Sequence, residues 1–300
     1  MPNTSLTQNP SFYSDKLTTY GFAFVAIVIF CFTMPVTKLL APIFSPFFVA
    51  ASRGVVGGIA ALLILMTWRC PLPAKHHWLG IFWVALGLVL LFPMLASLGL
   101  QTTDASHAGI IGALLPLGTA LVASRWHHER PLRRFWWCAL SATLLVVLFS
   151  GFKIKGGLNI GDAWLFASLP FACVGYAMGG RLAQLMPGWQ VMCWALVFSL
   201  PITLPILMIE WPKNSQAISL GYWQLLVYLG LFSQLLGLIL WNKAMAKGGI
   251  AKISQLQLLQ PFGTLVAAYW VMNEALEPLA MMLLALVAML VYAGQKASTQ

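Results

Sequence analysis

Ten apolar stretches, separated by short polar connections, follow one another along the chain. Each has 18 to 24 residues, and at 1.5 Å per residue a helix of that length crosses a hydrocarbon layer about 30 Å thick. Backbone groups in lipid must satisfy their own hydrogen bonds, so the stretches should be helices. The pattern predicts an all-α integral membrane protein with ten transmembrane helices, at residues 20–38, 44–66, 78–98, 105–124, 135–152, 161–183, 189–209, 219–242, 250–272 and 278–295.

The second half of the chain repeats the first. A shift of 145 residues aligns six identical positions, namely Leu114, Pro116, Gly118, Thr119, Ala123 and Glu129 with Leu259, Pro261, Gly263, Thr264, Ala268 and Glu274. Five helices per half is an odd number, so the second copy should be inverted, an arrangement that secondary transporters use to place a solute site between repeats. We expect a tail at 1–19, a first repeat at 20–152, a linker at 153–160 and a second repeat at 161–296.

The distribution of positive charge predicts the orientation of the chain. The composition is 60% hydrophobic and 8% charged, far fewer charges than a soluble surface needs. With a cytoplasmic N-terminus, twelve Lys and Arg residues fall on the cytoplasmic side and four outside, with Arg53 inside a helix. The positive-inside rule then places both termini in the cytoplasm and the linker outside, in a bacterial inner membrane. The basic residues are dispersed between apolar runs, so we expect the lipid bilayer, and no nucleic acid, as a partner.

Several segments resemble a known family. The ends of the two repeats read LLPLGTALVASRWHHERP and LLQPFGTLVAAYWVMNEAL, and the second repeat opens with GDAWLFASLPFACVGYAMGGRL. These segments, with Arg53 in the second helix, are similar to EamA-type domains of the drug/metabolite transporter superfamily. His128 and Asn273 stand where the family usually has glycine before its glutamate. The resemblance implies a bundle of two inverted five-helix repeats that moves metabolites, most often outward.

The motifs of enzymes are missing. His127-His128-Glu129 lacks the spacing of a zinc-binding helix, and among neighbouring arginines it is most simply a solvated turn. No nucleophile has a base beside it, and the five cysteines are scattered without a pairing pattern. We expect no catalytic residue, no metal and no cofactor. A non-transporting membrane protein, such as a lipid-modifying enzyme, is the alternative.

The charged residues within the helices limit the classes of solute that the protein could carry. The acidic residues fall near helix ends, whereas a pump for cationic drugs would use a carboxylate near the middle of the membrane. Carriers of phosphorylated sugars would need several buried cations, and only Arg53 qualifies. It lies about 13 Å along its helix and should face the interior, where it binds helix carbonyls or a solute carboxylate. A small neutral or zwitterionic solute fits best, most of all an amino-acid-like zwitterion.

Polar side chains in the ninth helix suggest a lining for the solute path. Ser254, Gln257, Gln260 and Thr264 are spaced by three or four residues and should share one helical face. They could bind solute or hydrogen-bond a neighbouring helix. Further candidates for the lining are Gln234, Tyr176 and Trp164.

Proton coupling has one candidate pair. His107 lies one turn after Asp104 at the outer end of the fourth helix, and histidine titrates near physiological pH. Asp104 could instead cap the helix while His107 only sits at the interface. The sequence leaves open the identity of the solute, the direction of transport and the oligomeric state.

Overall fold

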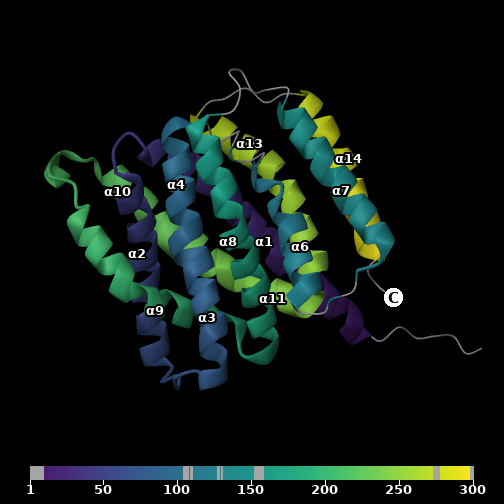
Figure 1. Cartoon of the computed structure of the whole chain (residues 1–300), viewed down its shortest axis with the longest axis horizontal. Coiled ribbons are helices and arrows are strands. Elements are labelled where there is room, and N and C mark those ends of the chain that lie inside the picture. The colour runs from purple at the N-terminus through teal and green to yellow at the C-terminus, as the bar shows by residue number, and fades with distance from the viewer. Residues whose placement is uncertain are drawn as a thin grey trace, which may run out of the picture.

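The computed structural model describes residues 10–103, 108, 111–126, 129, 131–151, 159–272 and 278–297, and every regular element in this part of the chain is a helix (Figure 1). The first half contributes α1 (Pro10–Leu40), α2 (Pro46–Thr67), η1 (Lys75–His77), α3 (Trp78–Val84), η2 (Ala85–Leu91), α4 (Phe92–Thr102), α6 (Leu115–Trp126) and α7 (Arg133–Gly151). The second half contributes α8 (Ile160–Leu185), α9 (Gly188–Ile209), η3 (Ser215–Ala217), α10 (Leu220–Tyr228), η4 (Leu229–Gly237), α11 (Leu238–Gly248), α12 (Ile250–Ser254), η5 (Gln255–Leu259), α13 (Gln260–Met272) and α14 (Pro278–Ala297).

The prediction of an all-helical membrane protein is confirmed. Within the described residues, six helical stretches are long and apolar enough to cross a membrane: 17–40, 46–67, 75–102, 160–185, 188–209 and 220–248. The other four predicted spans overlap α6, α7, the α12–α13 segment and α14 within the described residues, and the count of ten stays a prediction. The first helix begins at Pro10, earlier than the apolar run, because neither proline nor glycine interrupts the ten residues that follow.

Helices of the first half pack directly against helices of the second half. The first helix of the first half, α1, packs against α13, and the first helix of the second half, α8, packs against α6. In the same way α2 lies against α9 and α4 against α8. Figure 1 shows α7 and α14 side by side at one flank of the molecule. This reciprocal pairing is what two repeats related by a two-fold axis produce.

Two long spans are not α-helical throughout. The span 75–102 contains the π-helix η2 at Ala85–Leu91, and the span 220–248 contains the π-helix η4 at Leu229–Gly237. A shift of η2 by the repeat distance of 145 gives residues 230–236, which lie within η4. π-turns are rare and are frequent at functional sites. The two repeats therefore share an irregular turn at the same place.

One buried tryptophan supports the centre of the bundle. Trp241 on α11 is fully buried and meets Phe30 of α1 and Tyr176 of α8 edge-on, with ring centroids 6.2 and 6.4 Å apart. Such contacts fix the orientation of both rings. Phe30 and Tyr176 in turn form part of the wall of the cavity described next.

Candidate functional site

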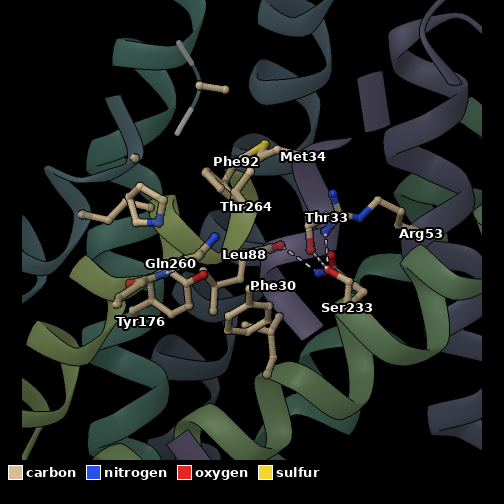
Figure 2. A pocket seen from close by; sticks show the side chains of 17 residues that line it. Phe30, Thr33, Met34, Arg53, Leu88, Phe92, Tyr176, Ser233, Gln260 and Thr264 are labelled. Atoms are coloured by element: carbon tan, nitrogen blue, oxygen red, sulfur yellow. Dashed lines mark hydrogen bonds between the residues drawn. The ribbon is translucent and has the colours of Figure 1, made fainter. Parts of the chain in front are cut away.

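A cavity lies between the two repeats, and both contribute to its wall. Side chains of α1, α2, η2, α4 and α6 line it from the first half, and side chains of α8, η4, α11, η5 and α13 from the second. The cavity has a volume of about 50 Å³ that the centres of water molecules can reach. This volume has room for about three or four water molecules. Figure 2 shows Arg53, Thr33 and Ser233 grouped at one side of the cavity, with Tyr176 and Gln260 at the other.

Arg53 brings a buried positive charge to this cavity. Its side chain is 5% exposed, and Nη2 donates to the Ser233 hydroxyl at a long 3.4 Å. Nε has no hydrogen-bond partner among the residues that the structure describes. No acidic residue is among the described residues that line the cavity. The guanidinium is therefore incompletely satisfied, which is costly for a charge at this depth.

The Ser233 hydroxyl joins three helices at this side of the cavity. It lies 2.8 Å from the Thr33 hydroxyl of α1 and also accepts from Arg53 of α2, while Ser233 itself belongs to η4. Neither Thr33 nor Ser233 was a candidate from the sequence. The signal in the chain was weak, because each is a small hydroxyl within an apolar run, a common helix–helix contact in membranes.

Gln234 connects the two π-helices. Its Nε2 donates to the main-chain carbonyl of Leu88 in η2 at 2.7 Å, so η4 and η2 are joined by a direct bond between the repeats. Both Gln234 and Leu88 line the cavity, and Gln234 is 1% exposed. Within the described part of the chain, its Oε1 has no hydrogen-bond partner.

The four polar residues of the ninth predicted helix do not all line the cavity, and they do not lie on one regular helix. Gln257, Gln260 and Thr264 line the cavity, but the segment is broken into α12, the 3₁₀ turn η5 and α13. Pro261 lacks the N–H that would bond the Gln257 carbonyl in an α-helix, and the tighter turn lets the N–H of Gln260 take that carbonyl instead. The side chains of Gln257 and Gln260 meet, with Nε2 of the first 3.1 Å from Oε1 of the second.

Two predicted lining residues lie elsewhere. Ser254 is buried and does not line the cavity, and its hydroxyl oxygen lies 2.9 Å from the carbonyl of Ala251 and 3.3 Å from that of Pro116, which share its one proton. It joins neighbouring helices, the alternative that its sequence position left open. Trp164 is 41% exposed on the outside of α8 and does not line the cavity. Tyr176 and Gln234 do line it, whereas His107 and Asp104 lie outside the described residues.

The interpretation of Glu129 as part of a solvated turn is wrong. The two carboxylate oxygens of Glu129 accept from the main-chain N–H groups of Ile250 and Ala251, each at 2.8 Å. These N–H groups belong to the first two residues of α12. The first N–H groups of a helix have no acceptor within the helix, and the helix dipole favours negative charge there. These two hydrogen bonds thus connect the segment after the fourth predicted span to the start of the ninth. Glu274, its counterpart in the repeat, lies outside the described residues.

A helical membrane bundle with a polar cavity between two repeats is the architecture of a membrane transporter. The EamA-like transporter family matches residues 17–151 and again 159–293. The chain belongs to this family, and it is a transporter rather than an enzyme.

Individual relatives agree with this assignment. The uncharacterized transporter YdeK of Bacillus subtilis is 38% identical over 259 residues, covering 86% of this chain and 90% of YdeK. The uncharacterized transporter sll0355 of Synechocystis is 26% identical over 262 residues, covering 78% of this chain and 77% of the relative. A crystal structure of a protein with 17% sequence identity superposes with a TM-score of 0.71 over 95% of this chain and 96% of that one, which shows the same fold.

Proposed function

We propose that this transporter is a secondary carrier that exports small amino-acid-like zwitterions by alternating access. The observation that carries the proposal is Arg53, a buried guanidinium that lines the central cavity with an unpartnered Nε. A solute carboxylate would supply the missing acceptor and the missing negative charge. Arginine presents its donors as a planar fork that suits a carboxylate.

The rest of the cavity wall supports a small solute that carries no net charge. One cation cannot neutralise several phosphates, and the absence of an acid from the described lining residues disfavours a solute that is only a cation. The polar partners on the other helices are neutral amides and hydroxyls, from Gln234, Gln257 and Thr264. The small volume of the cavity in this conformation favours a compact molecule.

The mechanism, the direction and the topology form part of the same proposal. The cavity lies where the two repeats meet, so a rocking of one repeat against the other would open it to each side in turn. We propose both termini in the cytoplasm of a bacterial inner membrane, with repeats at 20–152 and 161–296 joined by an external linker. Charge distribution supports this orientation, and the family resemblance supports export.

Transport by the purified full chain in liposomes tests the proposal. Loaded liposomes would be assayed for efflux of a panel of labelled amino acids, organic amines, carboxylic acids and sugar phosphates. We expect amino acids to be transported, and we expect Arg53→Gln to abolish that transport. Arg181→Gln is the matched control, because Arg181 is exposed on α8, donates to the side chain of Gln184 and does not line the cavity. Movement of amines or sugar phosphates in place of amino acids would refute the proposed solute.

Direction needs a separate measurement. Right-side-out and inverted membrane vesicles from cells that produce the protein would be compared for uptake of the transported amino acid. Export predicts accumulation in inverted vesicles, and equal uptake in both kinds would point to a carrier without a preferred direction.

A further inference from the structure

The orientation of the Gln234 carboxamide is determined by its partner. A main-chain carbonyl can only accept a hydrogen bond, so the group of Gln234 that faces the Leu88 carbonyl at 2.7 Å must be the Nε2 amide NH₂. Oε1 then points away from Leu88. That oxygen is buried, belongs to a residue on the cavity wall and has no hydrogen-bond partner in the described ranges of the chain.

Gln257 adds a second acceptor of the same kind. In the orientation that the structure has, its Nε2 donates to Gln260, and its Oε1 is also buried with no partner among the described residues. Leaving a buried acceptor unsatisfied is unfavourable, and the two side chains are only 1% and 4% exposed. A solute that supplied N–H donors would remove this cost.

Residues of the cavity wall therefore carry one cationic donor and two neutral acceptors that have no partner among the described residues. Arg53 Nε comes from the first repeat, and the two amide oxygens come from the second. An α-amino acid has the complementary groups, a carboxylate that accepts and an ammonium that donates. The same side chains offer no charge that would hold an amine lacking a carboxylate.

We propose that Gln234, assisted by Gln257, recognises the ammonium group of the solute while Arg53 binds its carboxylate. This inference rests on the proposed function and adds to it the residue that distinguishes an amino acid from a plain carboxylic acid. Gln234 is held in place by Leu88 of the opposite repeat, so the ammonium site is complete only when the two π-helices are in contact. Recognition of the ammonium group and closure of the two repeats are thereby linked.

Binding to the purified full chain in detergent tests the inference with matched ligands. Alanine would be compared by titration calorimetry with lactate, in which a hydroxyl replaces the ammonium, and with N,N,N-trimethylalanine, which keeps the positive charge but has no N–H donor. We expect the wild-type protein to bind alanine roughly tenfold or more tightly than either, since a hydrogen bond to a charged group contributes on that scale. This measurement needs no variant.

Two variants separate recognition from folding. Gln234→Met should weaken alanine binding by roughly tenfold or more and change lactate binding little. Gln255→Met is the matched control, because Gln255 is also buried and also donates to a main-chain carbonyl, that of Pro116, but does not line the cavity. It should keep the wild-type ratio of alanine to lactate affinity.

The outcomes are distinguishable. Equal binding of alanine, lactate and trimethylalanine by the wild-type protein would overturn the role of Gln234 while leaving a carboxylate-binding transporter. Loss of alanine and lactate affinity to the same degree in Gln234→Met would also overturn it. If the wild-type protein bound neither alanine nor larger amino acids such as leucine, the proposed function itself would fail, and this inference with it.

Discussion

Cys31 and Cys173 make the same contact from opposite repeats. The thiol of Cys31 on α1 donates to the carbonyl of Gln260, and the thiol of Cys173 on α8 donates to the carbonyl of Leu115, at 3.6 Å in both cases. Each acceptor immediately precedes the proline that the internal repeat aligns. The repeat seen in the sequence is therefore a repeat of tertiary contacts, in which the first helix of one half binds the broken helix of the other.

The glycines of the repeat explain how the helices come so close, and they give a first prediction. A Cβ at Gly118 would collide with Cys173 Sγ, and one at Gly263 would collide with Cys31 Sγ. We expect Gly118→Ala and Gly263→Ala each to destabilise the protein by about 1–3 kcal/mol, the usual cost of overpacking. The measurement is thermal unfolding in detergent.

Gly21→Ala on α1 is the control for this prediction, because nothing lies within 4 Å of a Cβ at that position. It should leave stability unchanged or raise it slightly, since alanine favours a helix over glycine. Cys31→Ala should partly rescue Gly263→Ala by removing the sulfur. Unaltered melting of both glycine variants would contradict the close packing.

The repeat and the buried arginine followed from the sequence because both depend on local or strictly periodic information. Arg53 is too costly to face lipid, so its interior position needs no knowledge of the neighbours. Trp164 could not be placed in the same way. Lipid and protein interior are both apolar, so hydrophobicity does not tell which face of α8 points inward.

Other parts of the site depend on contacts between distant segments. The bond from Gln234 to Leu88 and the cap that Glu129 forms on α12 join residues more than 120 positions apart, and no spacing in the chain encodes them. The π-helices were also missed. Their apolar residues match those of an ordinary helix, and only a changed hydrogen-bond pattern reveals them.

A second prediction concerns Glu129, which caps α12 at the end of the bundle that we propose to be cytoplasmic. Glu129→Ala removes both acceptors from the N–H groups of Ile250 and Ala251 and should destabilise the contact between this segment and α12 by about 0.5–2 kcal/mol, as loss of a helix cap does. We expect solute affinity to remain while the transport rate changes. Glu129→Gln, which keeps one acceptor oxygen, should lie between the wild type and the alanine variant.

Accessibility from the cytoplasm measures this effect. A single cysteine at Lys252, beside the cap, should react faster with a membrane-impermeant maleimide in the Glu129→Ala background than in the wild-type background, in a protein whose native cysteines have been replaced. Equal reaction rates in the two backgrounds would mean that the carboxylate does not hold this end closed. Glu210→Ala is a control. Its carboxylate accepts from Ser45 where α2 begins and α9 ends, whereas Cys70 and Gln190 meet near the other end of these two helices.

A third prediction tests the orientation in the membrane. The connection between α9 and α10 contains Lys213, and the connection between α2 and η1 contains Arg69. A single cysteine at 213 should react with impermeant maleimide added to intact cells, and one at 69 should react only after the membrane is opened. The reverse pattern would invert the proposed topology and place both termini outside.

The last prediction asks what the Arg53 charge is for. A carboxylate anchor and a conformational latch both require the arginine, so Arg53→Gln abolishes transport in either case and cannot separate them. Arg53→Lys keeps the charge but loses the planar fork. If Arg53 binds the solute, the lysine variant should bind alanine roughly tenfold or more weakly and should fold normally, because a bidentate contact becomes a single one.

A latch gives the opposite result. The contact of Arg53 with Ser233 joins α2 to η4, and a latch that works through it would also be weakened by Ser233→Ala. In that case Arg53→Lys and Ser233→Ala should both leave alanine affinity near the wild-type value and should both alter the rate of transport. Calorimetry on the two variants, combined with efflux from liposomes, decides between the roles. Weakened affinity in Arg53→Lys with retained affinity in Ser233→Ala assigns Arg53 to the solute, because only a ligand contact depends on the guanidinium fork and not on its hydroxyl neighbour.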